Sequence, residues 1–143
     1  MGQVRRETFQ NLWQTKQVKS KMNYFFDTYA IIEILVQNPK YNNYTITPIE
    51  AGTTIFNIME VHFYCLKNFG NNEAERVYNL VLPLLISTDD DIIKNANKFK
   101  LANLKKRFSF ADSIGYMTAL KLNAKFITGD YAFKNFENVE FVK

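Results

Sequence analysis

The stretch YFFDTYAIIEIL, residues 24–35, sets the pattern for the whole chain. Its three leading aromatic residues are typical of a short buried β-strand, and Asp27 stands at the carboxyl end of that strand. From Thr28 to Gln37 the apolar residues recur at helical spacing, and Asn38-Pro39 ends the helix. A strand that leads directly into a helix is the repeating unit of α/β proteins. An acid at such a junction is costly unless it is paired or binds a metal.

The rest of the chain continues this alternation of strands and helices. We expect strands at 44–47, 83–86, 125–128 and 139–142. We expect helices from Pro48 to about Asn68, over 73–82, from a Thr88–Asp91 capping box through Leu101, and over 109–122. The short connections predict an α/β fold with a mainly parallel central sheet and helices on both faces. Ligands of such sheets bind beyond the carboxyl ends of the strands.

The positive charge of the chain lies entirely at its N-terminus. Residues 1–21 carry five of the 18 basic residues and one of the 14 acidic ones, so residues 22–143 are neutral. We interpret 1–21 as a basic N-terminal extension and 22–143 as one folded domain. The extension could bind phosphates or could be a flexible leader. It could also result from a start codon assigned too early, in which case Met22 is the true first residue. The high isoelectric point is therefore weak evidence for a nucleic-acid partner.

The composition also bears on the location of the protein. No apolar run approaches the roughly 20 residues that cross a membrane. No secretory apolar segment precedes residue 22. Cys65 is the single cysteine, which excludes an internal disulfide. We therefore expect a soluble protein in the reducing cytoplasm.

Three further acids share the unusual setting of Asp27. Glu60 interrupts an apolar helical run, Asp112 follows Phe110-Ala111, and Asp130 follows the strand at 125–128. Strand ends and a helix start could bring all four acids to one crevice, where they would surround a cation. Carboxylates without clustered histidine or cysteine favour Mg²⁺ or Mn²⁺ over zinc.

Each acid also has a purely structural explanation to be weighed. Asp112 could complete a capping box with Ser109, Asp130 could cap the turn at 131–133, and Asp27 could cap the helix that follows it. Glu60 has no such role in the middle of a helix, although it could lie on a solvated stripe. Capping does not exclude metal binding, because a carboxylate has two oxygens.

Four short motifs in a fixed order resemble the PIN domain family. They are Phe26-Asp27-Thr28, then Ile46-Thr47-Pro48 leading to Glu60, then Phe110-Ala111-Asp112-Ser113, then Thr128-Gly129-Asp130. The resemblance covers about Met22 to Lys143 and is greatest to the VapC-type toxins of type II toxin–antitoxin systems. It implies a three-layer α/β/α fold and a metal-dependent endoribonuclease that binds one or two Mg²⁺ or Mn²⁺ ions. The catalytic and metal-binding residues carried over from the family are Asp27, Glu60, Asp112 and Asp130, with Thr28 and Thr128 as supporting residues.

The resemblance also implies partners, namely an RNA substrate, a cognate antitoxin and a second copy of the chain. The apolar helices around 55–66 and 77–82 offer surfaces for self-association. Lys105, Lys106 and Arg107 could contact substrate phosphates or form an ordinary exposed loop. Tyr29 departs from the small polar residue often found there, which could narrow the entrance.

Other functions remain open from the sequence. The chain could be a PIN nuclease of RNA processing rather than a toxin, or a non-catalytic PIN domain that binds RNA or protein. A phosphatase with an aspartyl nucleophile would need a second aspartate two places after Asp27, where this chain has Tyr29.

Overall fold

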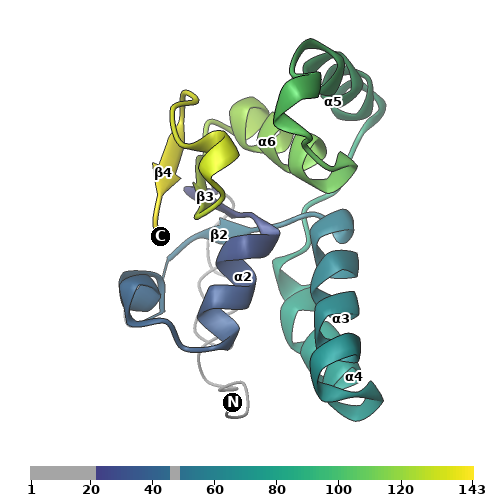
Figure 1. Cartoon of the computed structure of the whole chain (residues 1–143), viewed down its shortest axis with the longest axis vertical. Helices are drawn as coiled ribbons and strands as arrows, with labels where there is room; N and C mark the ends of the chain where they lie inside the picture. The colour runs from purple at the N-terminus through teal and green to yellow at the C-terminus, as the bar shows by residue number, and fades with distance from the viewer. Residues whose placement is uncertain (1–21, 46–48) are drawn as a thin grey trace.

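A four-stranded, all-parallel sheet forms the centre of the molecule (Figure 1). The computed structural model describes residues 22–45 and 49–143, so the expected basic extension at 1–21 lies outside the described residues. The strands run in the order β2-β1-β3-β4. They are β1 (Tyr24–Phe26), β2 (Ala51–Gly52), β3 (Lys125–Thr128) and β4 (Val139–Phe141). The predicted parallel sheet is confirmed.

Helices surround this sheet. The α-helices are α2 (Thr28–Leu35), α3 (Ile55–Phe69), α4 (Asn71–Val81), α5 (Asp90–Ala102) and α6 (Phe110–Leu122). Short 3₁₀ helices are η1 (Pro39–Tyr44), η2 (Leu82–Leu84), η3 (Leu104–Lys106) and η4 (Tyr131–Phe133). Helix α3 packs against α4, and α5 packs against α6. Among the described residues, no helix combines the length and the apolar character needed to cross a lipid bilayer.

The strand side chains divide the core between the two faces of the sheet. Neighbouring residues of a strand point to opposite faces. Phe26 and Ile127 therefore join the core that α2, α3 and α4 cover. Phe25 and Phe126 join an aromatic core under α6, where their rings stack with centroids 5.6 Å apart. This division confirms a three-layer α/β/α arrangement and accounts for much of the aromatic content.

The strand expected at 44–47 is wrong at Tyr44 and Thr45. Tyr44 ends the 3₁₀ helix η1, residues 46–48 lie outside the described part, and the second strand is Ala51–Gly52. Pro39 suits the first turn of η1 because its φ is already fixed, and the Asn38 side chain accepts a hydrogen bond from the Lys40 N–H. Tyr44 is then buried against the sheet with its ring edge toward Phe26. Burial of the aromatic rings thus overrides the alternating pattern.

Three helix and strand boundaries also differ from expectation. Helix α3 begins at Ile55 rather than Pro48, because the Thr54 hydroxyl caps it by accepting from the Asn57 N–H. The N-cap of α5 is Asp89 rather than Thr88, and its carboxylate accepts from the Ile92 N–H at 2.9 Å. The strand expected at 83–86 is largely η2, with a single parallel bridge from Leu85 to Thr53.

Candidate active site

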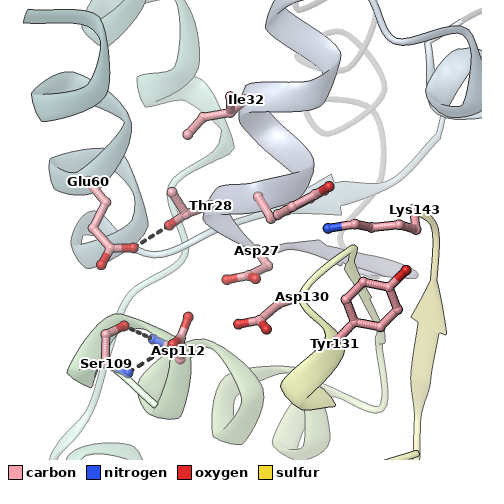
Figure 2. Close-up of a pocket in the computed structure, with 10 residues that line it drawn as sticks. Asp27, Thr28, Ile32, Glu60, Ser109, Asp112, Asp130, Tyr131 and Lys143 are labelled. Atoms are coloured by element: carbon pink, nitrogen blue, oxygen red, sulfur yellow. Dashed lines mark hydrogen bonds between the residues drawn. The ribbon is translucent and has the colours of Figure 1, made fainter. Parts of the chain in front are cut away.

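All four acids line one pocket at the carboxyl ends of β1 and β3 (Figure 2). Asp27 follows β1, Asp130 follows β3, Asp112 lies in the first turn of α6, and Glu60 comes from the middle of α3. The pocket has a volume of about 450 Å³. Its remaining lining residues are Thr28, Tyr29, Ile32, Ser109, Tyr131 and Lys143. Four segments that are far apart in the sequence therefore contribute carboxylates to a single cavity.

Asp27 is the most buried of these acids, with only 2% of its surface exposed. One oxygen, Oδ2, accepts a 2.8 Å hydrogen bond from the Thr128 hydroxyl. The other oxygen, Oδ1, is buried and has no hydrogen-bond partner among the described residues. Although Asp27 occupies the N-cap of α2, its side chain makes no capping bond, so the capping explanation for this acid is wrong.

The environment of the pocket disfavours the ionised forms of Asp27 and Asp112. Burial raises the pKa of Asp27 well above its usual value, and the negative charges of Asp112 and Glu60 raise it further. The hydrogen bond from Thr128 lowers this pKa, but its effect is smaller than that of burial. Burial also raises the pKa of Asp112 to about 6, with Glu60 and Asp130 adding to the effect. A bound cation would reverse this penalty, since an opposite charge nearby favours the ionised form.

Asp112 and Asp130 combine a capping role with a place in the pocket. Asp112 Oδ2 accepts from the Ser109 N–H at 2.8 Å, and the Asp112 N–H donates to the Ser109 hydroxyl at 3.0 Å. Asp130 Oδ1 accepts from the Ala132 N–H at 2.9 Å at the start of η4. Both capping predictions are therefore confirmed. Each cap uses one oxygen, which leaves the other for a ligand.

A chain of hydrogen bonds orients Glu60. The Thr28 hydroxyl donates to Glu60 Oε1 at 2.6 Å. Asn57 Nδ2 donates to the Thr28 hydroxyl oxygen at 3.1 Å, and Asn57 Oδ1 accepts from the Thr54 hydroxyl at 2.6 Å. Because Thr28 accepts from the amide, its own proton is directed at Glu60. The role of the buried Asn57 was not predicted from the sequence. A polar residue three positions before Glu60 in an apolar helix lies on the same helix face, and this spacing could have indicated a partner for the site.

Thr128 connects two of the acids. Its hydroxyl donates to Asp27 and accepts from the Asp130 N–H at 3.1 Å. The side chain is fully buried, so this hydroxyl has a fixed environment. Thr28 and Thr128 thus each hold one acid of the pocket by a direct hydrogen bond.

The three basic residues considered for substrate contact lie outside the lining of the pocket. Lys105 and Lys106 belong to η3, Arg107 follows it, and none of the three lines the pocket. The Lys106 ammonium lies over the Phe136 ring instead. Among the residues that the structure describes, the basic residue lining the pocket is Lys143, which lies beyond the end of β4. A sequence pattern could not reveal it, because only the pairing of β4 with β3 brings this residue beside the acids.

The donor set fits a hard divalent cation in part. All candidate ligands are oxygens, and the partnerless Asp27 oxygen provides an anchor in a pocket of acids. Within the described ranges, however, no three acidic, histidine or cysteine side chains lie close enough to form a closed metal cage. Mg²⁺ commonly keeps several waters and takes only one or two carboxylates from the protein. The residues therefore fit a partly hydrated Mg²⁺ or Mn²⁺ ion.

Comparison with known proteins adds a fold relationship. No family model matches the sequence, and no curated protein matches it. The chain shares its fold with a solved toxin–antitoxin structure. That structure is described as "Toxin-antitoxin complex from Klebsiella pneumoniae"; the match has a TM-score of 0.66 and covers 82% of this chain and 96% of that one. At 17% sequence identity, the match establishes a common architecture.

Proposed function

We propose that this protein is a Mg²⁺- or Mn²⁺-dependent endoribonuclease of the PIN family and the toxin of a type II toxin–antitoxin pair. The observation that carries the proposal is the convergence of Asp27, Glu60, Asp112 and Asp130 on one pocket with a partnerless carboxylate oxygen. The motif order in the sequence supports the family. The fold shared with a chain of a toxin–antitoxin complex supports the biological role.

The chemistry follows from the ligand set. An ion held by Asp27 and its neighbouring acids would neutralise the scissile phosphate and activate a water. The protein supplies the setting for that reaction. Thr128 fixes Asp27, the Asn57–Thr28 chain fixes Glu60, and the Ser109 capping box fixes Asp112. The Ser109 hydroxyl oxygen accepts the capping bond from the Asp112 N–H. A water activated by a bound ion would serve as the nucleophile, so the reaction would need no covalent intermediate with the protein.

The decisive experiment measures RNA cleavage by the purified protein and by Asp27→Asn. We expect cleavage with Mg²⁺ or Mn²⁺, products with 5′-phosphate and 3′-hydroxyl ends, and loss of activity in Asp27→Asn because the anchor charge is gone. Asp90→Asn, an exposed acid at the start of α5, is the matched control and should retain activity. Circular dichroism checks that the fold survives. Cleavage by Asp27→Asn, or by the wild type in EDTA, would exclude the metal-nuclease proposal.

The proposal includes protein partners. One stripe of α3 exposes four apolar side chains at helical spacing, namely Ile55, Met59, Phe63 and Leu66. The Phe63 side chain is 64% exposed. Exposed apolar stripes of this kind mark protein interfaces. The second expected surface, around 77–82, is largely core, because Val77 and Val81 are fully buried. The α3 stripe is thus the better candidate for contact with a second copy or an antitoxin.

A further inference from the structure

One side of the acidic pocket is built from aromatic rings and lysines. The Lys143 ammonium lies 4.7 Å from the centre of the Tyr29 ring and 4.8 Å from that of the Tyr131 ring. Figure 2 shows Tyr131 and Lys143 on the side of Asp27 and Asp130 that is opposite Glu60. Tyr131 is 61% exposed, which leaves much of its surface open to a ligand.

The same features continue beyond the pocket edge. The Tyr131 ring is tilted against the Phe141 ring with centroids 5.2 Å apart. The Lys134 ammonium lies 5.8 Å from the Tyr131 centroid and 5.5 Å from that of Phe141. We call this surface the aromatic–lysine wall, which comprises Tyr29, Tyr131, Lys134, Phe141 and Lys143. It places positive charge and π surface directly beside a cluster of acids.

The wall is held in place by well-defined contacts. The Tyr41 hydroxyl donates to the Val142 carbonyl at 2.6 Å, and the Val142 N–H donates to the Thr128 carbonyl at 2.9 Å. The Lys40 ammonium donates to the Lys143 carbonyl at 2.7 Å. These bonds fix the backbone next to Lys143. A hydrogen bond with Tyr29 raises the pKa of the Lys143 ammonium above its usual value.

We propose that the aromatic–lysine wall binds single-stranded RNA beside the acids, with the Tyr131 ring stacked on a nucleobase and Lys143 bound to an adjacent phosphate. Single-stranded nucleic-acid sites combine the same two elements, a ring for stacking and a cation for the backbone. The four acids repel a polyanion, and the wall supplies compensating positive charge at the edge of the pocket. This inference rests on the proposed function, because it takes RNA as the substrate.

Stacking on a tyrosine ring accepts every base, since each base has a π face. The wall therefore predicts binding with little sequence preference at the stacked position. An acidic peptide could pair with the lysines, but it would leave the exposed ring without a matching partner. The two ligand classes differ in how strongly binding depends on Tyr131.

The test is the affinity for a fluorescein-labelled decamer of adenylate, measured by fluorescence anisotropy in EDTA, where the proposed nuclease does not cut. Tyr131→Ala should weaken binding roughly 5- to 150-fold, as expected for one lost base–aromatic stack. Tyr131→Phe keeps the ring and should bind like the wild type. Lys143→Met should reduce the slope of log K against log salt by about 0.7, the value for one phosphate contact on a single strand.

Two matched variants control for surface effects. Leu101→Ala removes an exposed apolar side chain on α5, outside the α3 stripe, and Lys98→Met removes an exposed lysine on the same helix. Both should bind RNA like the wild type. Inorganic polyphosphate serves as a base-free competitor, and it should displace the decamer poorly. The proposal is overturned if Tyr131→Ala binds as well as Leu101→Ala, if Tyr131→Phe loses as much affinity as Tyr131→Ala, or if polyphosphate competes as well as unlabelled decamer.

Binding and cleavage separate this inference from the proposed function. If the wild type binds RNA through Tyr131 but never cleaves it, the wall stands and the nuclease proposal falls. If the wild type cleaves RNA and Tyr131→Ala does so with unchanged KM, the nuclease proposal stands and the wall falls.

Discussion

Asp112 links the stability of the metal-free protein to pH. Its pKa rises from 3.8 to about 6 on folding, mainly through burial, so the folded state binds more protons than the unfolded chain between these values. The contribution of Asp112 to the free energy of unfolding should therefore be greatest below about pH 4 and should fall as the pH rises through 6, by up to about 1.4 kcal/mol per unit of pKa shift. Asp27, whose pKa is also raised by burial, adds to this loss of stability with rising pH.

Urea unfolding in EDTA at several pH values measures this dependence. Asp112→Asn should flatten the decline near pH 5–6, because the amide does not titrate and its oxygen can still accept from the Ser109 N–H. Mg²⁺ should also reduce the decline by favouring the ionised acids. Parallel curves for the wild type and Asp112→Asn would show that this carboxyl does not control the effect.

At the scale of helices and strands, the sequence predicted the elements with a clear period. Helices α2, α4 and α6 and strands β1 and β3 lie where apolar spacing placed them, within about two residues at most boundaries. The two-residue strand β2 could not be predicted, because so short a segment has no period. Its Gly52 is held close to Ile86, where a Cβ would overlap that side chain.

The candidate site divides in a similar way. The four acids were predicted because carboxylates stand out in apolar stretches. Asn57, Tyr131 and Lys143 were missed because their importance arises from tertiary contacts. An exposed tyrosine and a lysine in a sequence do not reveal that two parallel strands bring them to the same pocket.

The turn after β3 gives a prediction at this scale. Gly129 leads from β3 to Asp130, and a Cβ there would lie 2.5 Å from the Val142 carbonyl oxygen and overlap the Tyr29 ring. Gly129→Ala should therefore push apart β4 and Tyr29, at a cost of about 1–3 kcal/mol for overpacking. Urea unfolding measures the loss. A variant as stable as the wild type would mean that the strand end can move freely at this point.

For the whole molecule, we expect self-association through the α3 stripe. Sedimentation at micromolar concentration should give about twice the monomer mass of 16.8 kDa. Phe63→Glu should shift the protein to monomer, because a charge in an apolar interface is costly. Leu101→Glu, at an equally exposed apolar position on α5, is the control and should leave the dimer intact. A wild-type monomer at this concentration would rule out the dimer.

The strand order β2-β1-β3-β4 has a consequence for synthesis on the ribosome. The first strand to emerge lies in the middle of the sheet, and its neighbour β3 appears about a hundred residues later, as the separation between Asp27 and Thr128 shows. A nascent chain that has passed α4 still lacks Asp112 and Asp130. The nascent chain therefore carries at most half of the acids of the pocket until Asp112 has been added. If the protein cleaves RNA, this order of appearance delays its activity until nearly the entire chain has left the ribosome that makes it.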